Sequence, residues 1–110
     1  MKYSLKQAEL VPLLEKKVSF RTQFFLFKTQ ANKLSHPRVG FVFSRKRGNA
    51  ILRNRYKRRI RELIRGYSWP VGADILCIPK GSLSSIGKQE WQQERERLQT
   101  KIEHLSLIHI

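Results

Sequence analysis

One segment, from Ala50 to Arg65, places the strongest limit on how this chain folds. It reads AILRNRYKRRIRELIR, and at about 100° per residue in a helix it has two unlike sides. One arc carries the apolar residues Leu52, Tyr56, Ile60, Leu63 and Ile64, and the other side carries Asn54, Arg58, Arg61 and Arg65. Such a stripe needs an apolar surface to cover it. The segment therefore predicts a helix that packs on a sheet.

The polar side of this helix is unusual in its charge. Arg53 and Lys57 lie at one edge of it, and Arg55 and Arg59 lie at the other. A solvated helical face normally mixes signs and forms i,i+4 ion pairs. From Arg45 to Arg65, however, there are ten Lys and Arg and one Glu, within a chain of net charge +15. Uncompensated guanidinium groups suit phosphate oxygens, so the pattern favours nucleic acid over a merely solvated face.

The flanking segments predict a small α+β sandwich with the order αββαβα. Residues 5–17 have a helical rhythm, and Pro12 is expected in the first turn of a bent or late-starting helix. Strands are expected at 18–28, 38–44 and 73–79, and a last helix at 87–105. Asn49 is a plausible N-cap for the basic helix, Gly48 permits a positive φ, and Gly66 is a typical residue at a helix end.

Two interpretations stay open for the rings of the first strand. Alternation places Phe20, Thr22, Phe24 and Leu26 on one face, and Arg21, Gln23, Phe25 and Phe27 on the other. Phe25 and Phe27 either stack on unpaired bases or pack as ordinary core under a helix.

Length and residue types narrow the class of protein. We expect one domain over residues 1–110, with its core at about 5–105 and a frayed tail at 106–110. The single cysteine, Cys77, excludes an internal disulfide and indicates a cytoplasmic setting. No apolar run approaches a membrane span. The eight acidic and three histidine residues are scattered, so we expect neither a catalytic side chain nor a metal ligand from the protein.

The run SRKRGNAILRNRYKRRIRE, from Ser44 to Glu62, resembles the signature of the protein subunit of bacterial ribonuclease P. The family pattern is approximately S-x-K-x-G-x-A-[VI]-x-R-N-x-x-K-R-x-[IL]-R-E. The flanking runs RVGFVFS and ADILCIP also resemble strands of that family, and the resemblance covers roughly residues 10–105. The positions that match are Ser44, Lys46, Gly48, Ala50, Ile51, Arg53, Asn54, Lys57, Arg58, Ile60, Arg61 and Glu62.

The resemblance implies a fold similar to a ribosomal-protein domain, with a left-handed βαβ crossover that departs from the usual right-handed rule. It implies partnership with a catalytic RNA and with precursor tRNA, whose 5′ leader the holoenzyme removes. The catalytic Mg²⁺ would be held mainly by the RNA. The protein would bind the leader in a cleft between sheet and helices and strengthen metal and substrate affinity. Neither DNA nor a membrane is an expected partner.

The resemblance also implies which residues act. The RNA contacts would be Arg45, Lys46, Arg47, Arg53, Asn54, Arg55, Lys57, Arg58, Arg61 and Arg65. The leader cleft would be lined by Phe25, Phe27, Val42 and Ser44, and Phe41 and Phe43 would belong to the core. Where the family's first helix usually supplies Phe or Tyr, this chain has Leu10 and Leu14. Leader contacts from that helix are expected to be weaker.

Three other functions compete with this one. A ribosomal protein or RNA chaperone would carry similar charge, but a generic basic helix needs no Gly and Ala at fixed offsets. A helix-turn-helix DNA-binding module is disfavoured because the basic helix follows a strand, not another helix. A protein-only nuclease lacks the clustered carboxylates that a two-metal site needs.

Overall fold

The computed structural model describes residues 4–69 and 72–108. The helices are α1 (Gln7–Leu14), α2 (Ala50–Arg65) and α3 (Lys88–Ile108). The strands are β1 (Phe20–Arg21), β2 (Phe25–Ala31), β3 (Arg38–Phe41) and β4 (Ala73–Pro79). Two short 3-10 turns, η1 (Arg45–Arg47) and η2 (Leu83–Ser85), precede α2 and α3.

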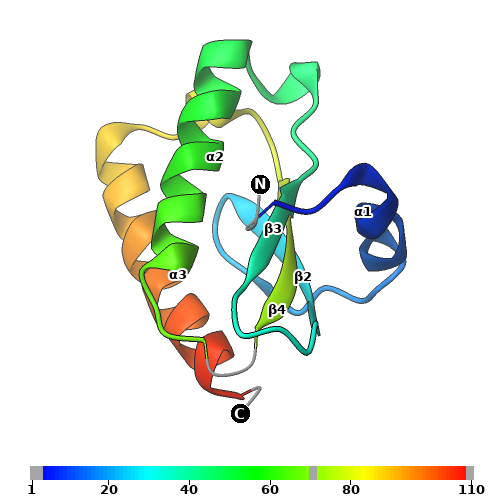
Figure 1. Ribbon diagram of the computed structural model, residues 1–110. Coiled ribbons are helices and arrows are strands. Elements are labelled where there is room, and N and C mark those ends of the chain that lie inside the picture. Colours follow the sequence, from blue (N-terminus) through cyan, green and yellow to red (C-terminus); the bar gives the residue numbers. More distant parts are fainter. Residues whose placement is uncertain (1–3, 70–71, 109–110) are drawn as a thin grey trace.

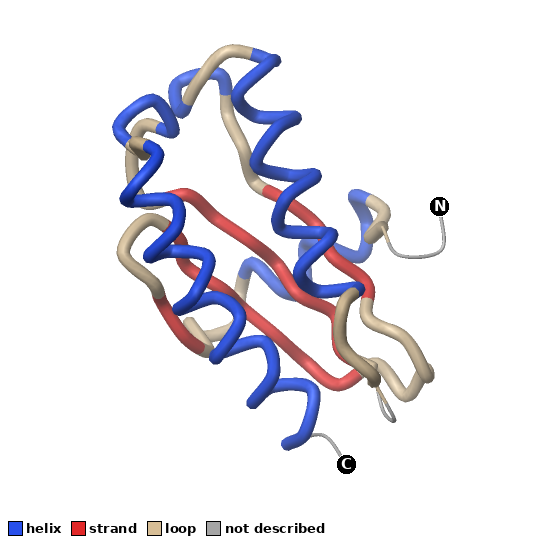
Figure 2. The backbone as a smooth tube through the Cα atoms, turned by 90° about the vertical axis from the view of Figure 1, so that its left-hand side faces the viewer, coloured by secondary structure: helices blue, strands red, loops and turns tan. Residues whose placement is uncertain are grey.

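The sheet has the strand order β1-β2-β4-β3. β2 runs antiparallel to both of its neighbours, whereas β3 and β4 are parallel. Figures 1 and 2 show α2 and α3 side by side on one face of this sheet and α1 on the opposite face. The predicted α+β architecture is confirmed.

The connection from β3 through α2 to β4 joins adjacent parallel strands. Viewed from the α2 side with these strands pointing upward, β4 lies to the left of β3, so the crossover is left-handed (Figures 1 and 2). This hand is uncommon for parallel strands. The strand order makes β3 an edge strand. The chain passes from β3 through η1 into α2, which brings the basic helix close to one border of the sheet.

Several expected boundaries are corrected. The strand expected at 18–28 is a hairpin, because the Thr22 amide donates to the Phe25 carbonyl (2.9 Å) and turns the chain. Pro12 lies inside α1, not in its first turn. β3 ends at Phe41, and α3 continues to Ile108, so residues 106–108 of the expected tail are helical. Residues 109 and 110 lie outside the described residues.

The ends of α2 follow the sequence closely. The helix spans Ala50–Arg65 as predicted, and the Asn49 side chain accepts a hydrogen bond from the Leu52 amide (2.9 Å). Gly48 has an extended backbone with φ of 160°, so the turn before α2 does not use the left-handed conformation that glycine would permit. Gly66 closes the helix in a right-handed conformation. Tyr56, Ile60 and Ile64 are buried against the sheet, and this fixes which way the cations point.

Candidate RNA-binding interface

The β3-facing edge of α2 carries a row of half-buried cations, Arg53, Lys57 and Arg61, spaced four residues apart. The Lys57 ammonium lies 6.0 Å from the centroid of the Phe43 ring, and the Arg61 guanidinium lies 5.2 Å from that of Phe41. Aromatic faces hold cations in this way without neutralising them. The row is therefore positioned and still charged.

These cations have few partners within the protein. Among residues 4–69 and 72–108, no carboxylate forms an ion pair with Arg53, Lys57, Arg58 or Arg61. The Nε atoms of Arg53 and Arg61 are also shielded from solvent and lack a hydrogen-bond partner within the same ranges. Shielded donors without an acceptor are costly, and an added acceptor would reach these two Nε atoms only if the side chains moved.

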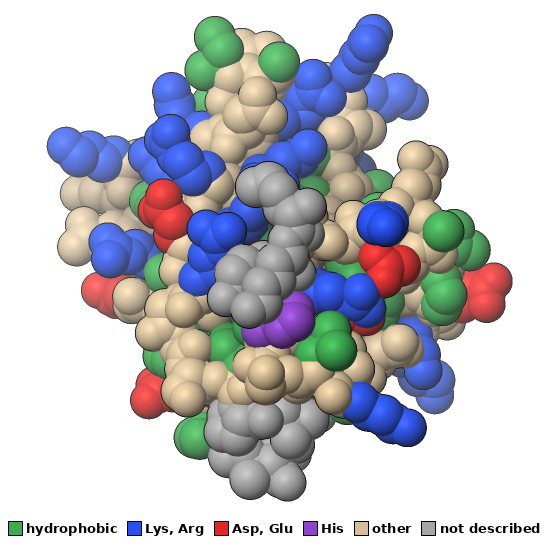
Figure 3. Space-filling model, in the orientation of Figure 1, with side chains coloured by type: hydrophobic (Ala, Val, Ile, Leu, Met, Phe, Trp, Pro, Cys, Tyr) green, Lys and Arg blue, Asp and Glu red, His purple; other side chains and the backbone are tan. Residues whose placement is uncertain are grey.

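The other predicted RNA contacts extend this surface. Asn54, Arg58 and Arg65 are exposed along α2, and Arg55 is exposed on the side toward α3. Arg45 and Lys46 are exposed in η1, with Arg47 half-buried beside them. Figure 3 shows Lys and Arg side chains gathered in the upper half of the view, over α2 and the turn before it. The structure brings the predicted set together, and RNA contact by each residue stays a prediction.

Lys57 offers a direct probe of phosphate binding. Burial lowers the pKa of its ammonium group, and repulsion from Arg61 and Arg53 adds to that shift. A bound phosphate would favour the charged form and raise this pKa. The RNA complex would then hold the Lys57 proton more tightly than the free protein does. The affinity for RNA should therefore fall as pH rises from the Lys57 pKa of the free protein to that of the complex. Side-chain NMR titration of Lys57 with and without RNA measures the shift, and an unchanged pKa would contradict phosphate contact.

An apolar groove adjoins the cation row on the other side of β3. It has a volume of about 550 Å³ and lies between α1 and the edge of the sheet. We call it the α1–β3 groove. Phe41 belongs to both surfaces, because its ring lines the groove and also lies beneath the Arg61 guanidinium. The residues that line the groove are Leu5, Gln7, Leu10, Val11, Leu14, Phe41 and Val42.

The structure revises the expected leader cleft. Phe25 and Phe27 are fully buried among core residues beneath α2 and α3, so their expected place in an open cleft is wrong. Val42 is 37% exposed and lines the α1–β3 groove. Ser44 is exposed just before η1, outside the groove lining. Phe41, expected in the core, is only half-buried and reaches the groove.

A partly buried polar network holds α1 against the sheet and thereby shapes this groove. The Arg38 guanidinium donates to both carboxylate oxygens of Asp74, at 2.8 and 2.7 Å, and also to Glu9 of α1. The Asn32 amide donates a further hydrogen bond to Asp74 (2.9 Å). The Lys6 amide and Arg38 both lower the pKa of Glu9. Gly40 leaves room for α1, since a Cβ there would lie 2.1 Å from a Leu10 methyl.

Comparison with known proteins decides the family. A family model described as Ribonuclease P matches residues 4–103. The chain belongs to the ribonuclease P protein family. It is 32% identical over 101 residues to the ribonuclease P protein component of Dehalococcoides mccartyi strain CBDB1, covering 92% of this chain and 84% of that protein.

Two further members agree with this assignment. The ribonuclease P protein component of Citrifermentans bemidjiense is 39% identical over 77 residues, which cover 69% of this chain and 66% of that protein. The solved structure of the RNase P protein from Thermotoga maritima superposes with a TM-score of 0.73 at 29% identity. That superposition covers 92% of this chain and 96% of the other. Family membership and fold thus rest on most of the chain and not on the signature alone.

The described residues contain neither a cluster of metal ligands nor a membrane-spanning helix. Within 4–69 and 72–108, no group of three or more His, Cys, Asp and Glu side chains is placed to hold a metal ion. No helix in the same ranges is both long and apolar enough to cross a membrane.

Proposed function

We propose that this chain is the RNA-binding subunit of a ribonuclease P holoenzyme, which removes the 5′ leader from precursor tRNA. The observation that carries the proposal is the cation row Arg53, Lys57 and Arg61, held half-buried on β3 without carboxylate partners among the described residues. Guanidinium and ammonium groups of this kind bind phosphate. In this proposal the catalytic RNA and precursor tRNA are the partners, and the RNA supplies the catalytic site.

The α1–β3 groove is the proposed path of the single-stranded leader. It joins the cation row at Phe41, so a strand leaving the row would pass directly onto apolar surface. Phe41 is the ring available there for stacking on a base, while Leu10 and Leu14 of α1 supply aliphatic contact instead. This composition supports weaker leader contacts from α1.

The proposal places the catalytic Mg²⁺ on the RNA. Its chemistry there would be to activate water and stabilise the charge that develops on phosphate. The protein would contribute cations that reduce repulsion between the two RNA molecules, and this would strengthen both metal and substrate binding.

Cleavage of precursor tRNA at low Mg²⁺ tests the proposal. We expect a bacterial ribonuclease P RNA to cleave faster with the protein than without it. Arg58→Ala should weaken RNA binding and reduce the slope of log affinity against log salt by about one unit, as loss of one phosphate contact does. Lys101→Ala removes an exposed cation of α3 and is the matched control. Folded protein that gives no stimulation would refute the function, and an unchanged slope would remove Arg58 from the interface.

A further inference from the structure

A second groove lies between α2 and α3, on the side of α2 away from β3. Arg59, Glu62, Leu63, Trp91 and Arg95 line a cavity of about 430 Å³ there. Arg59 and Trp91 also line a neighbouring cavity of about 280 Å³. We call the two together the α2–α3 groove. The remaining residues that line the second cavity are Arg55, Tyr56, Ile86, Gly87 and Lys88.

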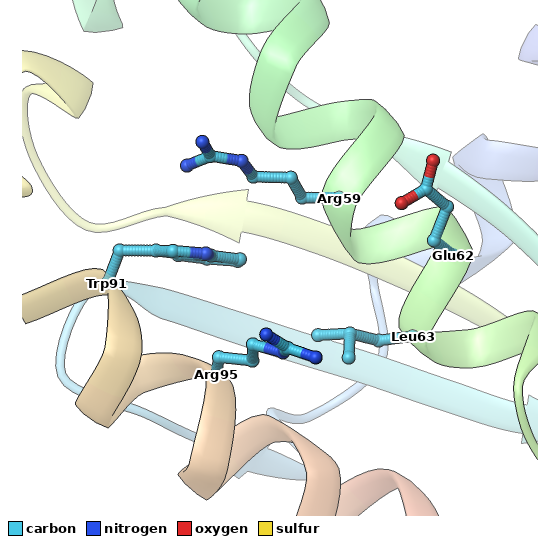
Figure 4. Close-up of a pocket in the computed structure, with 5 residues that line it drawn as sticks. All are labelled: Arg59, Glu62, Leu63, Trp91 and Arg95. Carbon is cyan, nitrogen blue, oxygen red and sulfur yellow. The ribbon is translucent and has the colours of Figure 1, made fainter. Parts of the chain in front are cut away.

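Arg59 and Trp91 form the centre of this groove. The Arg59 guanidinium lies 5.3 Å from the centroid of the Trp91 ring and 5.4 Å from that of Tyr56. The two rings meet edge to face at 5.2 Å. Figure 4 shows Arg59 extending from α2 and the indole extending from α3 toward it, with Arg95 running along the other side of the indole. An aromatic ring is thus presented between two guanidinium groups.

The charge of the groove favours an anion. Four cations line it, namely Arg55, Arg59, Lys88 and Arg95, against one carboxylate, Glu62. Figure 4 shows the Glu62 carboxylate turned away from the indole. None of the four cations forms an ion pair within the described part of the chain. A base stacked on an aromatic ring, with its phosphates on nearby guanidinium groups, is the usual arrangement for unpaired nucleotides.

The family signature does not account for this groove. Arg59 occupies a position that the signature leaves open, and Trp91 and Arg95 lie outside the signature. We propose that the α2–α3 groove binds an unpaired nucleotide of RNA, with the base against Trp91 and its phosphates contacting the guanidinium groups of Arg59 and Arg95. Because α2 also carries the cation row, one RNA strand crossing this helix can reach both surfaces. This inference rests on the proposed function in one respect, namely that the partner is RNA.

Tryptophan fluorescence of the full chain tests the groove, with an unstructured oligoribonucleotide of about ten nucleotides, within the usual site size, as the probe. Trp69 is buried with 5% of its surface exposed, so Trp91 is the reporter. We expect saturable quenching in the parent chain and none in Trp91→Phe. Arg59→Ala and Arg95→Ala should each raise the half-saturating concentration about three- to tenfold, as a lost charge-assisted contact does. Lys101→Ala should leave it unchanged.

Three results would overturn the inference. One is the absence of quenching at RNA concentrations that saturate the cation row, as followed by anisotropy of a labelled oligonucleotide. Another is equal quenching by an oligoglutamate of the same length, which would indicate acidic peptide. The third is an unchanged half-saturating RNA concentration in both Arg59→Ala and Arg95→Ala, measured on variants whose thermal unfolding is the same as that of the parent chain. In each case stimulated cleavage at low Mg²⁺ would still support the proposed function, so the two failures are separable.

Photocrosslinking in the assembled holoenzyme identifies the source of the nucleotide. The catalytic RNA and the precursor tRNA are labelled in separate experiments, and the peptide that contains Trp91 is analysed by mass spectrometry. We expect a crosslink to one of the two RNA molecules, diminished in Arg59→Ala. A crosslink to neither RNA would overturn the inference.

Discussion

Phe27→Ala is expected to lower the free energy of unfolding by about 3–5 kcal/mol, the range for a fully buried Phe reduced to Ala. The Phe27 ring has no exposed surface and stacks on the Phe20 ring, with 4.6 Å between the ring centroids. The centroid of the Phe25 ring lies 6.3 Å from that of Phe27. A domain of this size has only about 5–15 kcal/mol of net stability. Chemical denaturation measures the loss, and RNA affinity should fall only as the folded fraction falls.

Phe41→Ala is the matched control, because Phe41 is half-buried and lines the α1–β3 groove. It should reduce stability much less than Phe27→Ala and should lower affinity for leader-bearing precursor more than for mature tRNA. The reverse pattern, with normal stability and a selective leader defect in Phe27→Ala, would return Phe27 to the leader site. Stability and substrate preference are therefore read in the same pair of variants.

The error over Phe25 and Phe27 has a specific structural origin. Alternation along an unbroken strand puts Phe20 and Phe27 on opposite faces. The turn at Thr22 breaks the strand, and β1 then pairs with β2 so that Phe20 stands directly opposite Phe27. Both rings consequently face the α2–α3 layer. A two-residue strand gives too little periodicity to reveal this turn in the sequence.

The segments that were predicted well carry strong local signals. α2 has a wide apolar stripe and a capping Asn49, and β4 is a short apolar run, so their boundaries follow from local patterns. The α2–α3 groove depends instead on packing between residues 59 and 91, far apart in the chain. Helical spacing places Arg59 on an edge of α2, but no local pattern shows which ring it will meet.

Arg38→Met is the second substitution with a large expected effect, because it removes the partner of a buried carboxylate. Asp74 would keep only its hydrogen bond from Asn32 while remaining 96% buried. Loss of one partner from a fully buried pair lowers stability by about 3–5 kcal/mol. Here the Arg38 side chain is 23% exposed, so we expect about 2–3 kcal/mol by the same reasoning. Thermal and chemical denaturation measure this loss.

The same substitution should also affect the groove, since Arg38 joins Glu9 of α1 to Asp74 of β4. We expect Arg38→Met to weaken binding of leader-bearing precursor more than that of mature tRNA, even at temperatures where the protein is fully folded. Glu9→Gln is the matched control: it breaks only the outer contact and leaves Asp74 paired, so its loss of stability should be smaller. In the parent chain the pKa of Glu9 is lower in the folded state than in the unfolded state. The contribution of Glu9 to the free energy of unfolding is therefore complete above its unfolded-state pKa and disappears as pH falls through its folded-state pKa. Arg38→Met should reduce that acid-side loss of stability only in part, because the hydrogen bond from the Lys6 amide is the larger cause of the lowered Glu9 pKa and remains. If folded Arg38→Met keeps the parent chain's ratio of precursor affinity to mature-tRNA affinity, the α1–β3 groove does not depend on this network.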